Sequence, residues 1–205
     1  MMIESLWLVH PDEAMCNAFR RRFTGLRGVR VIRGRFEDLE PHDCFVTAGN
    51  AFGMMTAGID AAVVRLFGKE LMQRVQHTIM DQFFGEQPIG TAFVVPTGNA
   101  SIPFLAHAPT MRVPGNIEGT DKVYAATWAA LLAIHAHNRT AVDKIEVVGF
   151  PAMGTGFGGV PFDEAARQMA AAYRHYWEPP HRLDWDFVIE RHKAISYDGD
   201  KQVVR

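Results

Sequence analysis

Short apolar runs alternate along the chain with longer amphipathic stretches, and no other feature of the sequence constrains the fold as strongly. Strands are predicted at 5–10, 29–34, 44–48, 91–97, 102–108, 144–150 and around 185–190. Helices are predicted at 12–23, 59–84, 120–138 and 163–177, with Gly68 dividing the second into two. Strands that alternate with helices form a sheet covered on both faces, so the sequence predicts an α/β fold of three layers.

Three apolar runs, FVTA, AFVV and EVVGF, are too continuous for a sheet with one face in water, and they predict central strands. The polar tail from Ser196 onward predicts a poorly ordered segment. No repeat or linker divides the 205 residues, so we expect a single domain over 1–205. A chain of this length can be stable through the packing of its core alone.

The formal net charge of -2 argues against a nucleic-acid partner, because binding to that backbone needs clustered Lys and Arg. Arg20, Arg21 and Arg22 form the one dense basic cluster of the sequence. They fall at the end of the predicted helix 12–23, where cations interact favourably with the helix dipole. We therefore interpret this cluster as a helix terminus.

The two cysteines, Cys16 and Cys44, lack C-x-x-C spacing and predict buried thiols in a reducing compartment. His135 and His137 lie two apart, on different faces of a helix, and do not form a metal pair. The N-terminus carries Glu4 where a signal peptide is basic, and no apolar run approaches the roughly 20 residues that span a bilayer. We expect a cytoplasmic protein with no metal, no cofactor and no membrane association; the sequence does not indicate its oligomeric state.

Two glycine-rich segments each follow an apolar strand and lead into a helix. The first contains Asn50, Gly53 and Gly58, and the second, 154–159, contains four glycines. Such turns and helix N-termini present unpaired backbone N–H groups that bind phosphate oxygens. A single turn of this kind also serves simply to reverse the chain, but two at the carboxyl ends of strands in one sheet predict a phosphate-binding pocket.

These two segments resemble the signatures of the macro domain family. GIDAAVVRLFG, from Gly58 to Gly68, is similar to the family's helix G-[VI]-D-x-A-[IV]-x-R-x-x-G, and PAMGTGFGGVP is similar to its phosphate loop P-A-[IL]-x-T-G-x-[FY]-G-x-P. The matches span about residues 29–177 and look closest to a bacterial and phage-type branch. The resemblance implies a three-layer α/β/α domain with a mixed, mostly parallel sheet, extended by an N-terminal strand and helix and by a C-terminal strand and tail.

The resemblance also implies that ADP-ribose, or an ADP-ribosylated substrate, occupies the pocket. Asn50 would reach the distal ribose, Phe157 would cover it, and the amides of 154–157 would surround the diphosphate. An amide side chain both donates to and accepts from sugar hydroxyls, and glycines allow amides to face an anion. The implied ligand-binding residues are Gly34, Arg35, Ala48, Asn50, Gly58, Ile59, Met153, Gly154, Thr155, Gly156 and Phe157.

Asn50 and Asp60 are the catalytic candidates. In hydrolase branches that share GIDAA, the Asp matching Asp60 is proposed to orient or activate a water that attacks the anomeric carbon of the distal ribose, which is a general-base role. An Asp in a first helical turn also stabilises the helix dipole, and the sequence leaves both interpretations open.

Three positions depart from the family pattern. Arg35 stands where the family has an adenine-contacting Asp, which Glu37 or Asp38 could replace, and Val64 stands where one hydrolase branch has a histidine. Thr56 and Ala57 before Gly58 make that backbone less permissive than a run of glycines. Three functions therefore stay open: a hydrolase of ADP-ribosyl linkages, a non-catalytic reader of ADP-ribose or another nucleotide, and a structural module.

Two further features bear on the pocket. His107 is interpreted either as a pocket residue or as a hydrogen-bonded histidine of the core. The turn-rich loop 108–120 is long enough to be functional, and its part from Met111 to Gly119 is where a leaving group would be contacted.

Overall fold

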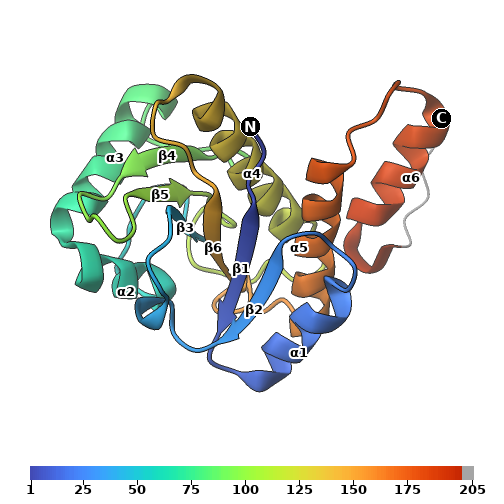
Figure 1. Cartoon of the computed structure of the whole chain (residues 1–205), viewed down its shortest axis with the longest axis horizontal. Helices are drawn as coiled ribbons and strands as arrows, with labels where there is room; N and C mark the ends of the chain where they lie inside the picture. Colours follow the sequence, from blue (N-terminus) through green and yellow to red (C-terminus); the bar gives the residue numbers. More distant parts are fainter. Residues whose placement is uncertain (200–205) are drawn as a thin grey trace.

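The computed structural model describes residues 1–199, in which a six-stranded sheet is flanked by six α-helices (Figure 1). The strands are β1 (Ser5–His10), β2 (Val29–Arg33), β3 (Cys44–Thr47), β4 (Phe93–Pro96), β5 (Phe104–His107) and β6 (Val147–Pro151). The helices are α1 (Glu13–Arg22), α2 (Gly58–Phe67), α3 (Lys69–Phe83), α4 (Lys122–Thr140), α5 (Phe162–Trp177) and α6 (Trp185–Ile195). Short 3-10 helices lie at Phe36–Asp38 and Tyr197–Gly199.

The strand order is β2-β1-β6-β3-β5-β4, and only the β4–β5 pair is antiparallel within the described residues. This arrangement confirms the mixed, mostly parallel sheet. The FVTA and EVVGF runs form the interior strands β3 and β6, as expected. The prediction that AFVV is a central strand is wrong, because β4 is an edge strand that ends at Pro96. Proline cannot donate to a strand ladder, so it is tolerated at such an edge.

Helices cover both faces of the sheet, which confirms the three-layer α/β/α architecture. Helices α1, α4 and α5 pack on one face and share one hydrophobic cluster with β1, β3, β5 and β6. Helices α2 and α3 pack on the other face, where a second cluster joins them to β4 and β5. Gly68 ends α2 with a φ of 89°, so the predicted division of the long helix at this residue is confirmed.

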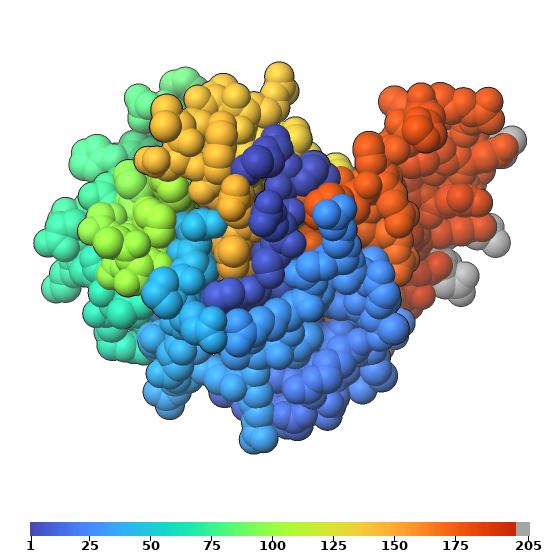
Figure 2. All heavy atoms as spheres, viewed as in Figure 1, coloured from blue at the N-terminus to red at the C-terminus, as the bar shows by residue number. Residues whose placement is uncertain are grey.

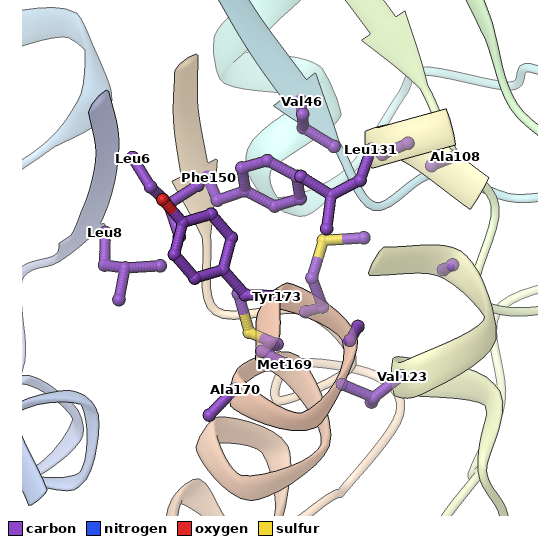
Figure 3. Close-up of a cluster of buried hydrophobic side chains, with 14 of the residues drawn as sticks. Leu6, Leu8, Val46, Ala108, Val123, Leu131, Phe150, Met169, Ala170 and Tyr173 are labelled. Atoms are coloured by element: carbon purple, nitrogen blue, oxygen red, sulfur yellow. The ribbon is translucent and has the colours of Figure 1, made fainter. Parts of the chain in front are cut away.

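The larger cluster is centred between β1, β6 and α5 (Figure 3). Leu8 and Phe150 project from the sheet toward Tyr173 and Met169 of α5, and all four side chains are buried. The Tyr173 hydroxyl donates to the Arg27 carbonyl at 2.7 Å, so its one polar atom is paired. Truncating a core aromatic of this kind typically costs about 3–5 kcal/mol.

Both ends of helix α1 carry side chains that stabilise it. The Asp12 side chain accepts a hydrogen bond from the Ala14 N–H at 2.8 Å, which caps the helix. Arg20, Arg21 and Arg22 occupy the last turn, and Arg21 and Arg22 pair with Asp163 at the start of α5. The interpretation of this basic cluster as a helix terminus is confirmed.

The predicted strand around 185–190 is wrong, because Trp185–Ile195 forms helix α6. The Asp184 carboxylate accepts from the Phe187 N–H at 2.9 Å and caps the helix, and this local bond outweighs the strand propensity of the aromatic and β-branched residues that follow. Helix α6 buries none of its residues and stands off the body of the molecule (Figure 2). Arg167 of α5 holds its end by donating to the carbonyls of Ala194 and Ser196.

The tail predicted to be poorly ordered is only partly described. Ser196 is buried, and its hydroxyl donates to the His192 carbonyl at 2.9 Å. The prediction is therefore wrong for Ser196 and the short helix that follows it, and residues 200–205 lie outside the described part of the chain.

Cys16 and Cys44 are free and buried, as the sequence predicts. None of the helices formed by residues 1–199 combines the length and apolar character that crossing a bilayer requires.

Candidate functional site

A cavity of about 670 Å³ opens at the carboxyl ends of the parallel strands. Its walls come from the last residues of β1, including His10, and from the residues that follow β2, β3, β5 and β6, including Gly34, Asn50, Thr110 and Ala152. Ligands of open α/β sheets bind at this edge, and the volume lies within the roughly 300–1,000 Å³ that small-molecule sites occupy.

Asn50 organises the loop between β3 and α2. Its Oδ1 accepts from the backbone N–H groups of Phe52 and Met54, and its Nδ2 donates to the Met54 carbonyl at 2.9 Å. The backbone also forms an isolated parallel bridge between Asn50 and Met111, which ties the loop to the segment after β5. Because Nδ2 carries two hydrogens, one remains available to a ligand while the other holds the loop.

Two groups of backbone amides border the cavity. The first intrahelical bond of α2 runs from the Ala61 N–H to the Ala57 carbonyl, so the N–H groups of Gly58, Ile59 and Asp60 are unpaired within the helix. On the opposite side, the N–H groups of Thr155, Gly156 and Phe157 take no protein acceptor within residues 1–199. Unpaired amides at a helix start and in a glycine-rich turn are the arrangement that binds phosphate oxygens.

The second loop requires glycine at specific positions. Gly154 has a φ of 74°, and a Cβ there would lie 2.7 Å from Val123 Cγ2. A Cβ on Gly158 would lie 2.3 Å from the Gly154 carbonyl oxygen. A Cβ on Gly156 would meet no atom within 4 Å, so the absence of a side chain there leaves space in the cavity. The tight turn from Gly154 to Gly158 thus sets the direction of the amides between them.

Asp60 lies in the first turn of α2, on the cavity wall, with 5% of its surface exposed. The Thr47 hydroxyl of β3 donates to its Oδ1. Burial raises the pKa of Asp60 from 3.8 to about 6, although the Thr47 hydrogen bond acts in the opposite direction. The carboxyl group is therefore a base whose ionisation falls close to neutral pH, the range in which a general base is most effective.

His107 is buried at the end of β5, and its Nδ1 lies 2.7 Å from Gln87 Oε1. This geometry confirms the interpretation of His107 as a hydrogen-bonded histidine of the core, since it does not border the cavity. Burial lowers its pKa from 6.5 to about 4, so the ring is neutral at physiological pH.

The far end of the cavity is formed by the segment after β2. Arg35 and Glu37 are exposed, Phe36 is buried beneath them, and all three border the cavity. Of the two acids that could replace the family's Asp, Glu37 borders the cavity, whereas Asp38 is not among the lining residues. From the loop predicted to be functional, Met111, Val113 and Pro114 contribute to the wall.

The structure brings together nearly all the residues that the sequence assigned to the pocket. The cavity is bordered by Gly34, Arg35, Ala48, Asn50, Gly58, Ile59, Asp60, Gly154, Thr155, Gly156 and Phe157. Met153 is the exception, because its side chain is fully buried in the core beneath the loop. Which of these residues contact a ligand stays a prediction.

The sequence analysis missed the wall formed at the end of β1, where Val9, His10 and Pro11 border the cavity. The parallel pairing of β1 with β6 places these residues at the same edge as the second loop. Within the loop 108–120, the sequence analysis did not single out Thr110, a fully buried residue of the wall whose hydroxyl has no hydrogen-bond partner among the described residues. Thr110 is a candidate ligand contact. No cluster of three potential metal ligands is present in residues 1–199.

The fold and the cavity define a three-layer α/β/α protein with its site at the carboxyl ends of the strands. The chain belongs to the Macro domain family, whose sequence model matches residues 46–169. The matched segment contains both glycine-rich loops and the strands between them.

One relative and two solved structures are similar to this chain over most of its length. An uncharacterized protein of Aquifex aeolicus is 31% identical over 178 residues, which cover 86% of this chain and 93% of the relative. A mutant of the Oceanobacillus iheyensis macrodomain, solved with ADPR, has a TM-score of 0.60 at 18% identity, over 87% of this chain and 82% of that one. The Trypanosoma brucei macrodomain in complex with ADP-ribose has a TM-score of 0.59 at 19% identity, over 76% of this chain and 60% of that one.

Proposed function

We propose that this protein binds ADP-ribose and hydrolyses the bond between the distal ribose of an ADP-ribosylated substrate and its leaving group. The observation that carries the proposal is that two sets of backbone N–H groups without acceptors face one cavity from opposite sides. One set lies at the start of α2 and the other in the loop 154–158. A diphosphate between them would accept hydrogen bonds from both sides. Solved macrodomains with ADPR and with ADP-ribose share this fold, which supports the choice of ligand.

Asp60 is the proposed base of the reaction, and Asn50 would position the distal ribose. A water oxygen forms a bond to the anomeric carbon while Asp60 takes one of its protons. The bond to the leaving group breaks, and its electron pair departs with that group. For an ester the product is a carboxylate, which needs no proton, and Asp60 then releases its proton to solvent. The pKa of Asp60, about 6, leaves the base ionised at neutral pH.

Calorimetric titration with ADP-ribose, with AMP and ADP as controls, tests the binding step at physiological salt. We expect saturable binding of ADP-ribose that depends on the distal ribose. If none of the three ligands binds, the proposal is wrong, and Arg35 in place of the family's acid becomes the first residue to examine.

Hydrolysis is tested separately with ADP-ribosylated protein, nucleic acid and small-molecule ester substrates. Asp60→Ala should abolish turnover and leave ligand binding largely intact. Binding without product release in the wild-type protein would instead identify a reader, the function favoured by Val64 at the position of the branch histidine. We also propose a cytoplasmic location, where both buried cysteines remain reduced.

A further inference from the structure

The side chain of His107 lies close to the Asp60 carboxyl group, and Gly49 lies beside both. A Cβ built on Gly49 would lie 2.4 Å from His107 Nε2 and 3.3 Å from Asp60 Oδ2. The two atoms are therefore no further apart than the sum of these distances. Two hydrogen bonds in series, each of about 2.8 Å through a shared water molecule, span a separation of this size. Gly49 keeps this region free of a side chain.

Adjacent strands present these groups to Asp60 from the same face of the sheet. Thr47 of β3 and His107 of β5 are register partners in a parallel pair, so their side chains project to the same side. The Thr47 hydroxyl donates to Asp60 Oδ1, and the His107 ring lies near Oδ2. The two carboxyl oxygens thus have different neighbours, a donor at Oδ1 and an imidazole nitrogen at Oδ2.

Gln87 determines which nitrogen of His107 carries the proton. Its Nε2 donates to the carbonyls of Thr91 and His107, at 3.1 and 3.4 Å, so its Oε1 must face the ring. Oε1 can only accept, so the His107 proton resides on Nδ1. Nε2 is then an acceptor, fully buried and without a hydrogen-bond partner among the described residues. A buried acceptor of this kind favours a donor beside it.

We propose that His107, held by Gln87 with its proton on Nδ1, is a positioning residue for Asp60, and that its Nε2 accepts a hydrogen bond from the protonated carboxyl, directly or through one water. This role rests on the proposed hydrolysis. This hydrogen bond forms only when Asp60 is protonated, so it stabilises the protonated form and raises the pKa of the carboxyl group. Asp60 is therefore a stronger base toward the attacking water. The proton taken from that water is held between Oδ2 and Nε2 until the product leaves.

Among residues 1–199, no other ionisable group shifts the pKa of Asp60 or of His107. Burial and the Thr47 hydroxyl account for the pKa of Asp60, and burial alone accounts for that of His107. The remaining ionisable side chains that border the cavity are His10, Arg35, Glu37 and Arg65. On its other side, the His107 ring contacts Phe93 of β4, which carries no charge. A change in the titration of Asp60 can therefore be assigned to His107.

Two substitutions separate the ring nitrogens of His107. In His107→Asn, the amide nitrogen replaces Nδ1 and keeps the contact with Gln87, while the acceptor at Nε2 is lost. In His107→Gln, the longer side chain can place its Oε1 at the position of Nε2 and restore the acceptor. His175→Asn is the control, because His175 is half-buried and its Nδ1 is hydrogen-bonded to Tyr124, but it does not border the cavity.

The experiment measures the titration of the Asp60 carboxyl carbon by NMR, and the pH dependence of single-turnover hydrolysis. We expect His107→Asn to lower the midpoint by about one pH unit, the size of one hydrogen bond, with no change in His107→Gln or His175→Asn. The acid limb of the rate profile should move with it, and the rate should fall about tenfold with KM unchanged. An unchanged midpoint in a folded His107→Asn variant would overturn the proposal.

If the His107→Asn variant does not fold, a measurement on the wild-type protein still tests the proposal. Nitrogen-15 NMR of His107 should show the proton on Nδ1, and a proton on Nε2 would refute the proposal. If ADP-ribose does not bind, the proposed function fails, but the tautomer and the Asp60 midpoint still decide whether the two residues are coupled.

Discussion

Replacing Asp60 by asparagine should stabilise the folded protein at neutral pH. Burial raises the pKa of Asp60 from 3.8 to about 6, so the unfolded chain loses this proton at a lower pH than the folded protein does. Ionisation of Asp60 therefore opposes folding, and its cost grows as the pH rises from 3.8 to about 6 and is constant above that range. Asparagine has the same shape without the charge, and its Oδ1 can still accept from Thr47.

The expected gain is about 1 kcal/mol at pH 4.5 and about 3 kcal/mol at pH 7.5, from the linkage between pKa and stability. Urea unfolding of wild type and Asp60→Asn at both pH values measures it. Asp121→Asn is the control, since Asp121 is exposed and its side chain forms no capping bond to α4; its effect should stay within about 0.5 kcal/mol. A gain that is equal at both pH values, or a loss at pH 7.5, would refute the electrostatic explanation.

Further substitutions test the two loops and the base. Gly154→Ala should lower stability by about 1–3 kcal/mol, because of its positive φ and the contact with Val123, whereas Gly156→Ala should be neutral; thermal unfolding compares the two. Asn50→Ala removes three hydrogen bonds from its loop and should cost about 1–3 kcal/mol in chemical unfolding, with weaker binding of ADP-ribose. Phe157 is 60% exposed, so Phe157→Ala should leave stability unchanged and weaken ADP-ribose about tenfold by calorimetry. The rate of hydrolysis should rise with pH up to about 6, as Asp60 ionises, and then level off; a rate that falls over this range would contradict the general-base role.

The pocket could be predicted because its residues are contiguous with strand ends. Asn50 and Gly154 each come three residues after the end of an apolar strand, and the parallel sheet brings such ends to one edge. Met153 lies in the predicted loop but does not border the cavity, because a motif specifies the path of the backbone, whereas the turn directs this side chain into the core. The contribution of His10 could have been found by applying the same rule to β1.

Other features depend on contacts that the sequence does not record. WDFVIE is rich in aromatic and β-branched residues, as a strand is, and the cap from Asp184 accompanies the helix that forms instead. The position of β4 at an edge depends on strand order, which the length of an apolar run does not specify. The approach of His107 to Asp60 joins β5 to α2 across Gly49, and no spacing in the sequence encodes it.

The place of β6 in the sheet has a consequence for synthesis of the chain. It lies between β1 (Ser5–His10) and β3 (Cys44–Thr47), although both are made long before it, and among residues 1–199 it is the last strand to be made. Until Val147–Pro151 leaves the ribosome, β2-β1 and β3-β5-β4 are separate fragments, each with an unpaired inner edge. The loop 154–158 follows β6 directly, so the nascent chain completes its sheet and one wall of its cavity at nearly the same moment. A polypeptide terminated before β6 has neither.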